Sequence, residues 1–172
     1  MLVTHEHGDH NGVEAIVGAP PILRSTAGRL ESPFGEVLAI ASEHDPVAGT
    51  ERGPNTIFVF SLGGIRVAHF GDFGQSSLRD EQAHAIGEVD LVFLPVGGGP
   101  TLDAAGAHAI VARIRPRWVV PMHYRTPRVN FLESADAFIE RSDDARRLDS
   151  PAFDTAELAG GDGPVVVVLA SP

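Results

Sequence analysis

Three histidines and one aspartate fall within six residues near the start of this chain, in the segment His5-Glu6-His7-Gly8-Asp9-His10. The residues before it, Leu2-Val3-Thr4, have the composition of a strand end, and a helical segment is predicted after it. His5 and His7 are two residues apart, so in an extended segment they point the same way. Gly8 lets the chain turn sharply, which brings the aspartate and the third histidine toward the same region. A solvated histidine tract is the alternative, but such tracts are usually compositional tails, so the segment predicts a metal site.

The composition limits how a metal is held and which partners are expected. The chain has no cysteine, so imidazole and carboxylate groups must supply the ligands. The formal charge of −10, without a run of basic residues, argues against nucleic acid as a partner. No apolar stretch approaches the ~20 residues of a membrane span, and no export signal precedes the histidines. We expect no membrane partner, a cytoplasmic location and a small-molecule substrate.

Apolar β-rich runs alternate with helical stretches, which predicts a layered α/β fold in one domain over residues 1–172. Leu62-Gly63-Gly64 separates two of these runs and predicts a hairpin. Asn11 with Glu14, and Thr101, are the predicted helix caps. The stretch 143–163 is predicted to be an irregular surface connection. The predicted strands are 37–41, 56–61, 65–70, 91–96, 118–121 and 165–170, and the predicted helices are 11–17, 77–86, 102–114 and 131–141.

The pattern H-x-H-x-D-H at a strand end closely resembles the signature of the metallo-β-lactamase superfamily. Members of that fold place a lone His, an Asp after a Gly, and a final His at later strand ends. His44, Asp72 and His123 follow in that order. The segments Leu94-Pro95-Val96-Gly97-Gly98 and Met122-His123-Tyr124 resemble a subgroup of bacterial and archaeal metal-dependent hydrolases that also contains a sugar-lactone hydrolase. Taken alone, these three residues could instead be a surface loop histidine, a turn former and a core histidine.

The resemblance implies an αββα sandwich with two divalent metal ions. His5, His7 and His44 would hold the first, and Asp9, His10 and His123 the second, with Asp72 bridging them. This donor set suits zinc and tolerates manganese or iron. Asp9 and Asp72 are the implied catalytic carboxylates, and metal-bound hydroxide would cleave an ester, lactone or phosphoester bond.

The remaining candidates are weaker. His69 is interpreted as a support for a ligand or a core residue, and His84 and His108 as residues on solvated helix faces. Arg52 could bind a substrate anion or only serve its glycine turn. Tyr124 could contact substrate or only pack.

The resemblance departs from its family at the N-terminus, because relatives have several strands before the first histidines and this sequence has four residues there. We therefore expect an N-terminally truncated sandwich with low solubility or homo-oligomerisation, since unpaired strand edges favour association. Three alternatives to a hydrolase of a small polar substrate stay open. They are a nuclease of the same superfamily, a redox di-iron protein, disfavoured because such relatives typically have Glu in place of His7, and an inactive remnant that still binds metal.

Overall fold

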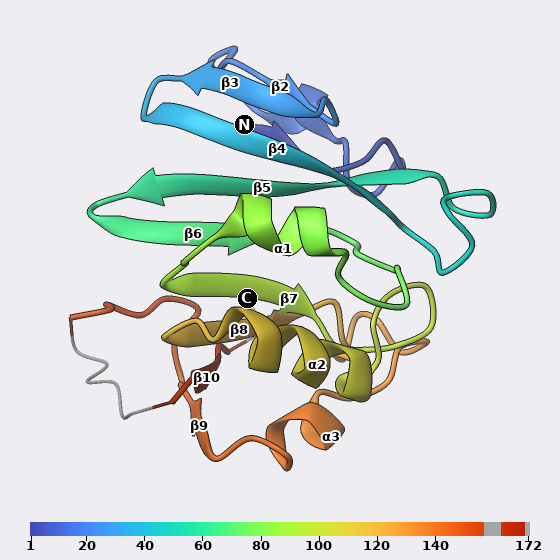
Figure 1. The fold of residues 1–172 in the computed structure, drawn as a ribbon, viewed down its shortest axis with the longest axis vertical. Coiled ribbons are helices and arrows are strands. Elements are labelled where there is room, and N and C mark those ends of the chain that lie inside the picture. The colour runs from blue at the N-terminus through green and yellow to red at the C-terminus, as the bar shows by residue number, and fades with distance from the viewer. Residues whose placement is uncertain (157–162, 171–172) are drawn as a thin grey trace.

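Eight strands form one mixed β-sheet in the computed structural model, which describes residues 1–156 and 163–170 (Figure 1). Their order across the sheet is β3-β4-β5-β6-β7-β8-β10-β9. The bounds are β3 Gly28–Ser32, β4 Gly35–Glu43, β5 Pro54–Leu62, β6 Ile65–His69, β7 Leu91–Pro95, β8 Trp118–Met122, β9 Asp144–Arg147 and β10 Val165–Val168. Every predicted strand is therefore present, with ends shifted by a few residues.

Strand direction decides which residues meet at one edge of this sheet. β5 is antiparallel to both β4 and β6, so β4 and β6 run the same way. β7 and β8 are parallel to β6 and to each other. The carboxyl ends of β4, β6, β7 and β8 consequently lie along the same edge, and the residues that follow these strands are brought together there.

Helices cover one face of the sheet. Figure 1 shows α1 (Asp80–Ile86) and α2 (Ala104–Ile114) on the same face, with α3 (Asp136–Ile139) packed next to α2. The alternation of side chains along each strand divides the core between the two faces. On β8, Val119 packs into the main core beneath the helices, whereas Trp118 and Val120 pack into a second apolar cluster on the opposite face.

A second, two-stranded sheet pairs β1 (Leu2–Val3) in parallel with β2 (Leu23–Arg24). Leu2 and Leu23 pack against a small apolar cluster that includes Phe58 of β5. The predicted α/β class is confirmed. Within the described residues, β1 and β2 form the second β-sheet of the predicted αββα sandwich.

The hairpin between β5 and β6 is confirmed. Leu62 pairs with Ile65, which leaves Gly63 and Gly64 as a two-residue turn. Both glycines have positive φ, 59° and 82°. This is the backbone that a tight hairpin turn requires and that glycine adopts without steric cost.

The helix predicted over residues 11–17 is wrong, because only a 3-10 turn forms there, at Val13–Ala15. The predicted cap fails because the Asn11 amide turns back to Glu6, where Nδ2 donates to the backbone oxygen and to Oε2. The turn buries none of its own residues. A helix this short has no packed face to stabilise it.

Two other helix predictions were too long or wrongly capped. Of 131–141 only α3 is helical, because the backbone of Glu133 pairs with Gly97 and Arg125 in the loops. The N-cap of α2 is Asp103, whose Oδ1 accepts from the Gly106 N–H at 2.8 Å. Thr101 is therefore not the cap.

The stretch 143–163, predicted to be irregular, contains the edge strand β9, which pairs in parallel with β10. Polar and charged residues such as Asp144 and Arg147 make its pattern weak in the sequence, as is common on sheet edges. Residues 157–162 of that prediction lie outside the described residues. Among the helices that the structure describes, none is long and apolar enough to cross a bilayer.

Candidate metal centre

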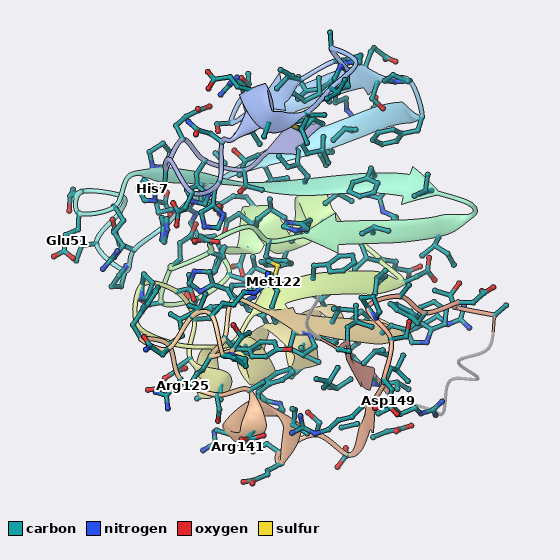
Figure 2. The ribbon with its side chains drawn as sticks, turned by 180° about the vertical axis from the view of Figure 1, so that it is seen from behind. His7, Glu51, Met122, Arg125, Arg141 and Asp149 are labelled. Atoms are coloured by element: carbon teal, nitrogen blue, oxygen red, sulfur yellow. The ribbon has the colours of Figure 1, made fainter. Side chains whose placement is uncertain are left out.

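The proposed ligands lie at the strand ends identified above. His5 follows β1, His44 follows β4, Asp72 comes shortly after β6, and His123 follows β8. His10 comes from the loop that leads away from β1. Figure 2 shows His7 at the end of the molecule from which the loop carrying Glu51 projects.

The carboxylate of Asp72 lies at the centre of four imidazoles. Its Oδ2 is 3.2 Å from Nε2 of His44, 3.2 Å from Nε2 of His123, 3.5 Å from Nε2 of His10 and 3.7 Å from Nε2 of His5. Asp72 itself is only 5% exposed. One oxygen atom of a buried carboxylate thus faces four ring nitrogens.

His7 completes the cluster on the side of His5 and His44. Its ring centroid is 4.9 Å from that of His5 and 5.0 Å from that of His44. The ligand atoms of these three histidines lie within 4.8 Å of one another, and so do those of His5, His10 and Asp72. The structure therefore offers two adjoining donor groups.

Asp9 lies at the open side of the cluster. Its Oδ2 is 3.6 Å from Nε2 of His10, and its side chain is 81% exposed. The structure brings it to the same region as the other candidates, but its carboxylate is free to meet solvent or a ligand.

The buried Nε2 of His5 fits the presence of a metal ion. Nε2 of His5 is buried and has no hydrogen-bond partner, which is uncommon for a polar atom in a protein interior. Nδ1 of the same ring lies 3.0 Å from the Thr4 hydroxyl. A cation in front of Nε2 would give this nitrogen the partner that it lacks.

The second nitrogen of two other rings is also occupied. Nδ1 of His44 lies 3.1 Å from the carbonyl oxygen of Pro100, which can only accept, so this nitrogen carries the proton. Nδ1 of His123 lies 3.2 Å from the Thr101 hydroxyl. Such contacts fix the orientation of metal-binding histidines and leave Nε2 available.

The charges in the cluster balance around Asp72. Burial alone would raise the pKa of Asp72, but hydrogen bonds from His123 and His44 and the positive charge that the rings can carry lower it. Burial lowers the pKa of His5 to about 4, so this ring is neutral at pH 7. Burial alone would also lower the pKa of His44, but its hydrogen bond to Asp72 and the negative charge there raise it. A cation beside Asp72 would balance the negative charge that the rings facing it otherwise balance.

Two glycines that the sequence analysis did not single out shape the site. A Cβ on Gly97 would lie 2.3 Å from the backbone oxygen of His123, and one on Gly74 would lie 2.4 Å from the backbone oxygen of His44. The backbones approach so closely that no side chain fits between them. His123 itself has a positive φ of 50°, a strained conformation typical of functional sites.

Asp45 also escaped the sequence analysis. It is buried, and its two carboxylate oxygens accept backbone N–H groups from Val47, Gly49, Glu51 and Arg52 at 2.7–3.0 Å. Burial alone would raise the pKa of Asp45, but these N–H donors lower it. The loop after His44 is thus folded around one carboxylate. Asp directly after a candidate ligand is the signal that could have identified it.

The two weak candidates for substrate contact differ in their surroundings. The Arg52 side chain is exposed, and its backbone N–H serves Asp45. Tyr124 is partly buried and packs against the main core, so its packing role is observed.

The remaining histidines have three different settings. His69 is partly buried, stacks on Phe93 with ring centroids 5.6 Å apart, and accepts the Gly71 N–H at Nδ1, in agreement with its predicted supporting role. His84 is exposed on α1, as expected. The prediction for His108 is wrong, because it is partly buried and its Nε2 contacts the Phe138 carbonyl at 2.9 Å. It joins α2 to α3.

Comparison with known proteins agrees with this geometry. The sequence profile of the beta-lactamase superfamily domain matches residues 1–123. A protein of Thermococcus kodakarensis described as a UPF0173 metal-dependent hydrolase is 29% identical over 157 aligned positions, which cover 73% of this chain and 66% of the relative. Another with the same description, from Natranaerobius thermophilus, is 30% identical and is covered to 65%. The chain spans about two thirds of the length of these relatives.

Solved structures show the same fold. A Thermotoga maritima protein assigned to the zinc-dependent hydrolases of the metallo-β-lactamase superfamily has a TM-score of 0.75 and 25% identity, with 98% of this chain and 79% of that chain covered. A metallo hydrolase of Ignicoccus hospitalis has a TM-score of 0.61 at 22% identity, with 81% and 69% covered, and supports the fold alone. Since the profile matches well over half of its residues, the chain belongs to the metallo-β-lactamase superfamily.

Proposed function

We propose that this chain is a metal-dependent hydrolase that acts on a small polar substrate through two divalent metal ions, with zinc as the first choice and manganese or iron as substitutes. The observation that carries the proposal is the position of Asp72 Oδ2, 3.2–3.7 Å from four imidazole nitrogens. A lone carboxylate oxygen facing four nitrogen donors is an arrangement suited to bridging two cations.

The two donor groups suggest how the residues divide. The first group, His5, His7 and His44, would hold one ion, and His10 is grouped with Asp72 and His5 in the second. The resemblance to the family adds Asp9 and His123 to His10 as holders of the other ion, with Asp72 between the two. Bound ions of this kind would supply Lewis acidity, which lowers the pKa of a coordinated water to about 7 and polarises the bond to be cleaved. Five imidazoles and two carboxylates are the ligand types that zinc prefers.

The chain's own carboxylates would then have separate tasks. Asp72 is buried and its lowered pKa keeps it negatively charged, so it would hold and balance the cations. Asp9 is 81% exposed beside His10, so it can orient the attacking water and accept its proton. The nitrogen donors on either side of Asp72 keep the site rigid while the substrate enters from the open side.

The bonds that fit this chemistry are an ester, a lactone or a phosphoester. The formal charge of −10 disfavours a nucleic-acid substrate, because tracking phosphates requires basic surface. The exposed Arg52 side chain in the loop that begins at His44 is a candidate contact for a substrate carboxylate or phosphate.

The proposal is tested by metal analysis of protein purified without chelators, followed by a screen of lactones, carboxylic esters, thioesters and phosphodiesters. We expect about two metal ions per chain and turnover of at least one class. Asp72→Ala should lose metal and activity together. Asp90→Ala is the matched control. Asp90 lies just before the amino end of β7, away from the strand ends that carry the site, and its carboxylate accepts the backbone N–H of Arg66. Metal without turnover on any substrate would instead support an inactive remnant, and protein without metal would refute the proposal.

A further inference from the structure

The turn that presents Asp72 is short and depends on its neighbours. It begins after His69 at the end of β6 and passes through Phe70 and Gly71, which has a positive φ of 57°. The position of the Asp72 carboxylate, and hence its distances to the four imidazoles, follows from the path of this turn.

Asn55 holds one side of the turn. It is 1% exposed on β5, and its Oδ1 accepts the backbone N–H of Asp72 at 3.0 Å. Its Nδ2 donates to the Phe70 carbonyl and to the Ser42 hydroxyl, both at 2.8 Å. Because a carbonyl can only accept and a backbone N–H can only donate, these partners fix which end of the amide is the oxygen.

His69 holds Gly71, the residue before Asp72. Its Nδ1 accepts the backbone N–H of Gly71 at 3.1 Å, and its ring stacks on Phe93. A ring that accepts at Nδ1 is neutral and carries its proton on Nε2. The two successive N–H groups of Gly71 and Asp72 are thus each received by a side chain, the first by His69 at the end of β6 itself and the second by Asn55 on the neighbouring strand β5.

The turn is also pressed against this support. A Cβ on Gly71 would lie 2.4 Å from Oδ1 of Asn55 and 2.7 Å from Cβ of Thr4. The Thr4 hydroxyl in turn contacts Nδ1 of His5. A small shift at Gly71 would therefore reach Asp72 directly and His5 through Thr4.

We propose that Asn55 and His69 are paired positioning residues that fix the carboxylate of Asp72 by accepting the two successive backbone N–H groups of the Gly71–Asp72 turn. This inference rests on the proposed metal site. Neither side chain touches the metal-facing oxygen of Asp72, so both act through the backbone.

The first test measures metal affinity by competition with a chromophoric chelator. Asn55→Leu keeps the approximate size and removes all three hydrogen bonds, and His69→Phe keeps the aromatic stacking and removes the acceptor. Each should weaken binding of at least one ion by about 10–100-fold, the range found when supports of metal ligands are lost. His69→Asn places an amide oxygen near the position of Nδ1 and should recover most of the affinity. Should Asn55→Leu fail to fold, the His69 pair still decides the matter.

A second measurement distinguishes positioning from general stability and needs no metal. Hydrogen exchange followed by NMR in the metal-free protein should show the Gly71 and Asp72 amides protected in the wild type. The Gly71 amide should exchange faster in His69→Phe and regain protection in His69→Asn.

A third measurement uses cobalt in place of the native metal. With cobalt bound, the visible spectrum should change in the Asn55→Leu and His69→Phe variants.

Gln82→Leu is the matched control, because Gln82 is another buried amide with bonds to Ala41, Gln75 and Arg79 and none to the seven proposed ligands. It should lower stability while the cobalt spectrum and metal affinity stay as in the wild type. If wild-type protein binds two ions and the Asn55 and His69→Phe variants bind them equally well with an unchanged spectrum, the inference is wrong and the proposed function stands. If wild-type protein binds no metal, the proposed function itself fails.

Discussion

The hydroxyl oxygen of Thr101 lies 3.2 Å from Nδ1 of His123, and Nε2 of the same ring faces Asp72 at 3.2 Å. The single hydroxyl proton of Thr101 is directed at the Gly98 carbonyl, 3.4 Å away. The oxygen can therefore accept from Nδ1–H, so that a cation could take the place of a proton at Nε2, the nitrogen that faces Asp72. A residue first predicted as a helix cap instead sets the proton position of a candidate ligand.

Replacing Thr101 with valine should accordingly weaken metal binding by about 10-fold or more, since the shape is kept and the acceptor for Nδ1–H is lost. Isothermal titration of the metal-free protein with zinc measures this. Thr26→Val, at an exposed position before β3, is the matched control and should bind as the wild type does. Equal affinities in both variants would contradict the assigned tautomer role.

Gly97→Ala should damage the same ligand by another route. The new Cβ would meet the backbone oxygen of His123 at 2.3 Å and Cα of Tyr124 at 2.6 Å. Backbone atoms cannot rotate away, so we expect a loss of about 1–3 kcal/mol of stability together with weaker metal binding. Urea unfolding and metal content check the two effects. Gly12→Ala has no atom within 4 Å of its new Cβ and should be nearly neutral. A stable Gly97→Ala variant with full metal content would show that the loop can shift without cost.

The sequence predicted the strands well because their cores are continuous apolar runs that few other structures can bury. Leu91–Pro95 and Trp118–Met122 are examples, and both lie at the centre of the sheet. The edge strands β3 and β9 were missed because one face of each is solvated and charged residues interrupt the pattern. Helix 11–17 failed because its predicted cap residue Asn11 forms other hydrogen bonds, which no local pattern reveals.

The ligands that are adjacent in the sequence could be predicted from the sequence alone. His5, His7, Asp9 and His10 form one motif, and His44, Asp72 and His123 could be placed only through a family resemblance and their positions after apolar runs. The structure brings His44, Asp72 and His123 to one edge because β4, β6 and β8 run in the same direction, and the N-terminal motif reaches them from β1 in the small second sheet. Asn55 could not be foreseen, because its three hydrogen bonds join segments that are distant in the sequence.

The protonation of His69 gives a pH dependence with a definite sign. Burial lowers its pKa from 6.5 to about 4. Between these two pH values the unfolded chain binds a proton at His69 and the folded protein does not. His69 therefore lowers the free energy of unfolding as the pH falls from 6.5 toward 4, and it contributes no pH dependence above 6.5. His69→Asn keeps the acceptor and does not ionise. In metal-free protein, the stability of the wild type relative to this variant should therefore decline over that pH range, as measured by urea unfolding at several pH values. A constant difference from pH 7 to pH 4 would show that His69 titrates normally.

Metal should stabilise the folded chain, because the donor groups of the cluster converge only when the strand ends are assembled. A ligand that binds only the native state at 100 times its dissociation constant adds about 2.7 kcal/mol, which corresponds to roughly 5–10 °C in melting temperature for a chain of this size. His44→Gln should remove most of this shift, because His44 is buried against Asp72 with Nε2 directed at its carboxylate. His84→Gln makes the same change on the exposed face of α1 and should leave the shift intact. Thermal melts of both variants with and without zinc measure the shift. An equal shift in His44→Gln and His84→Gln would mean that zinc binds outside the cluster, since exposed histidines can bind the ion without the strand ends being assembled.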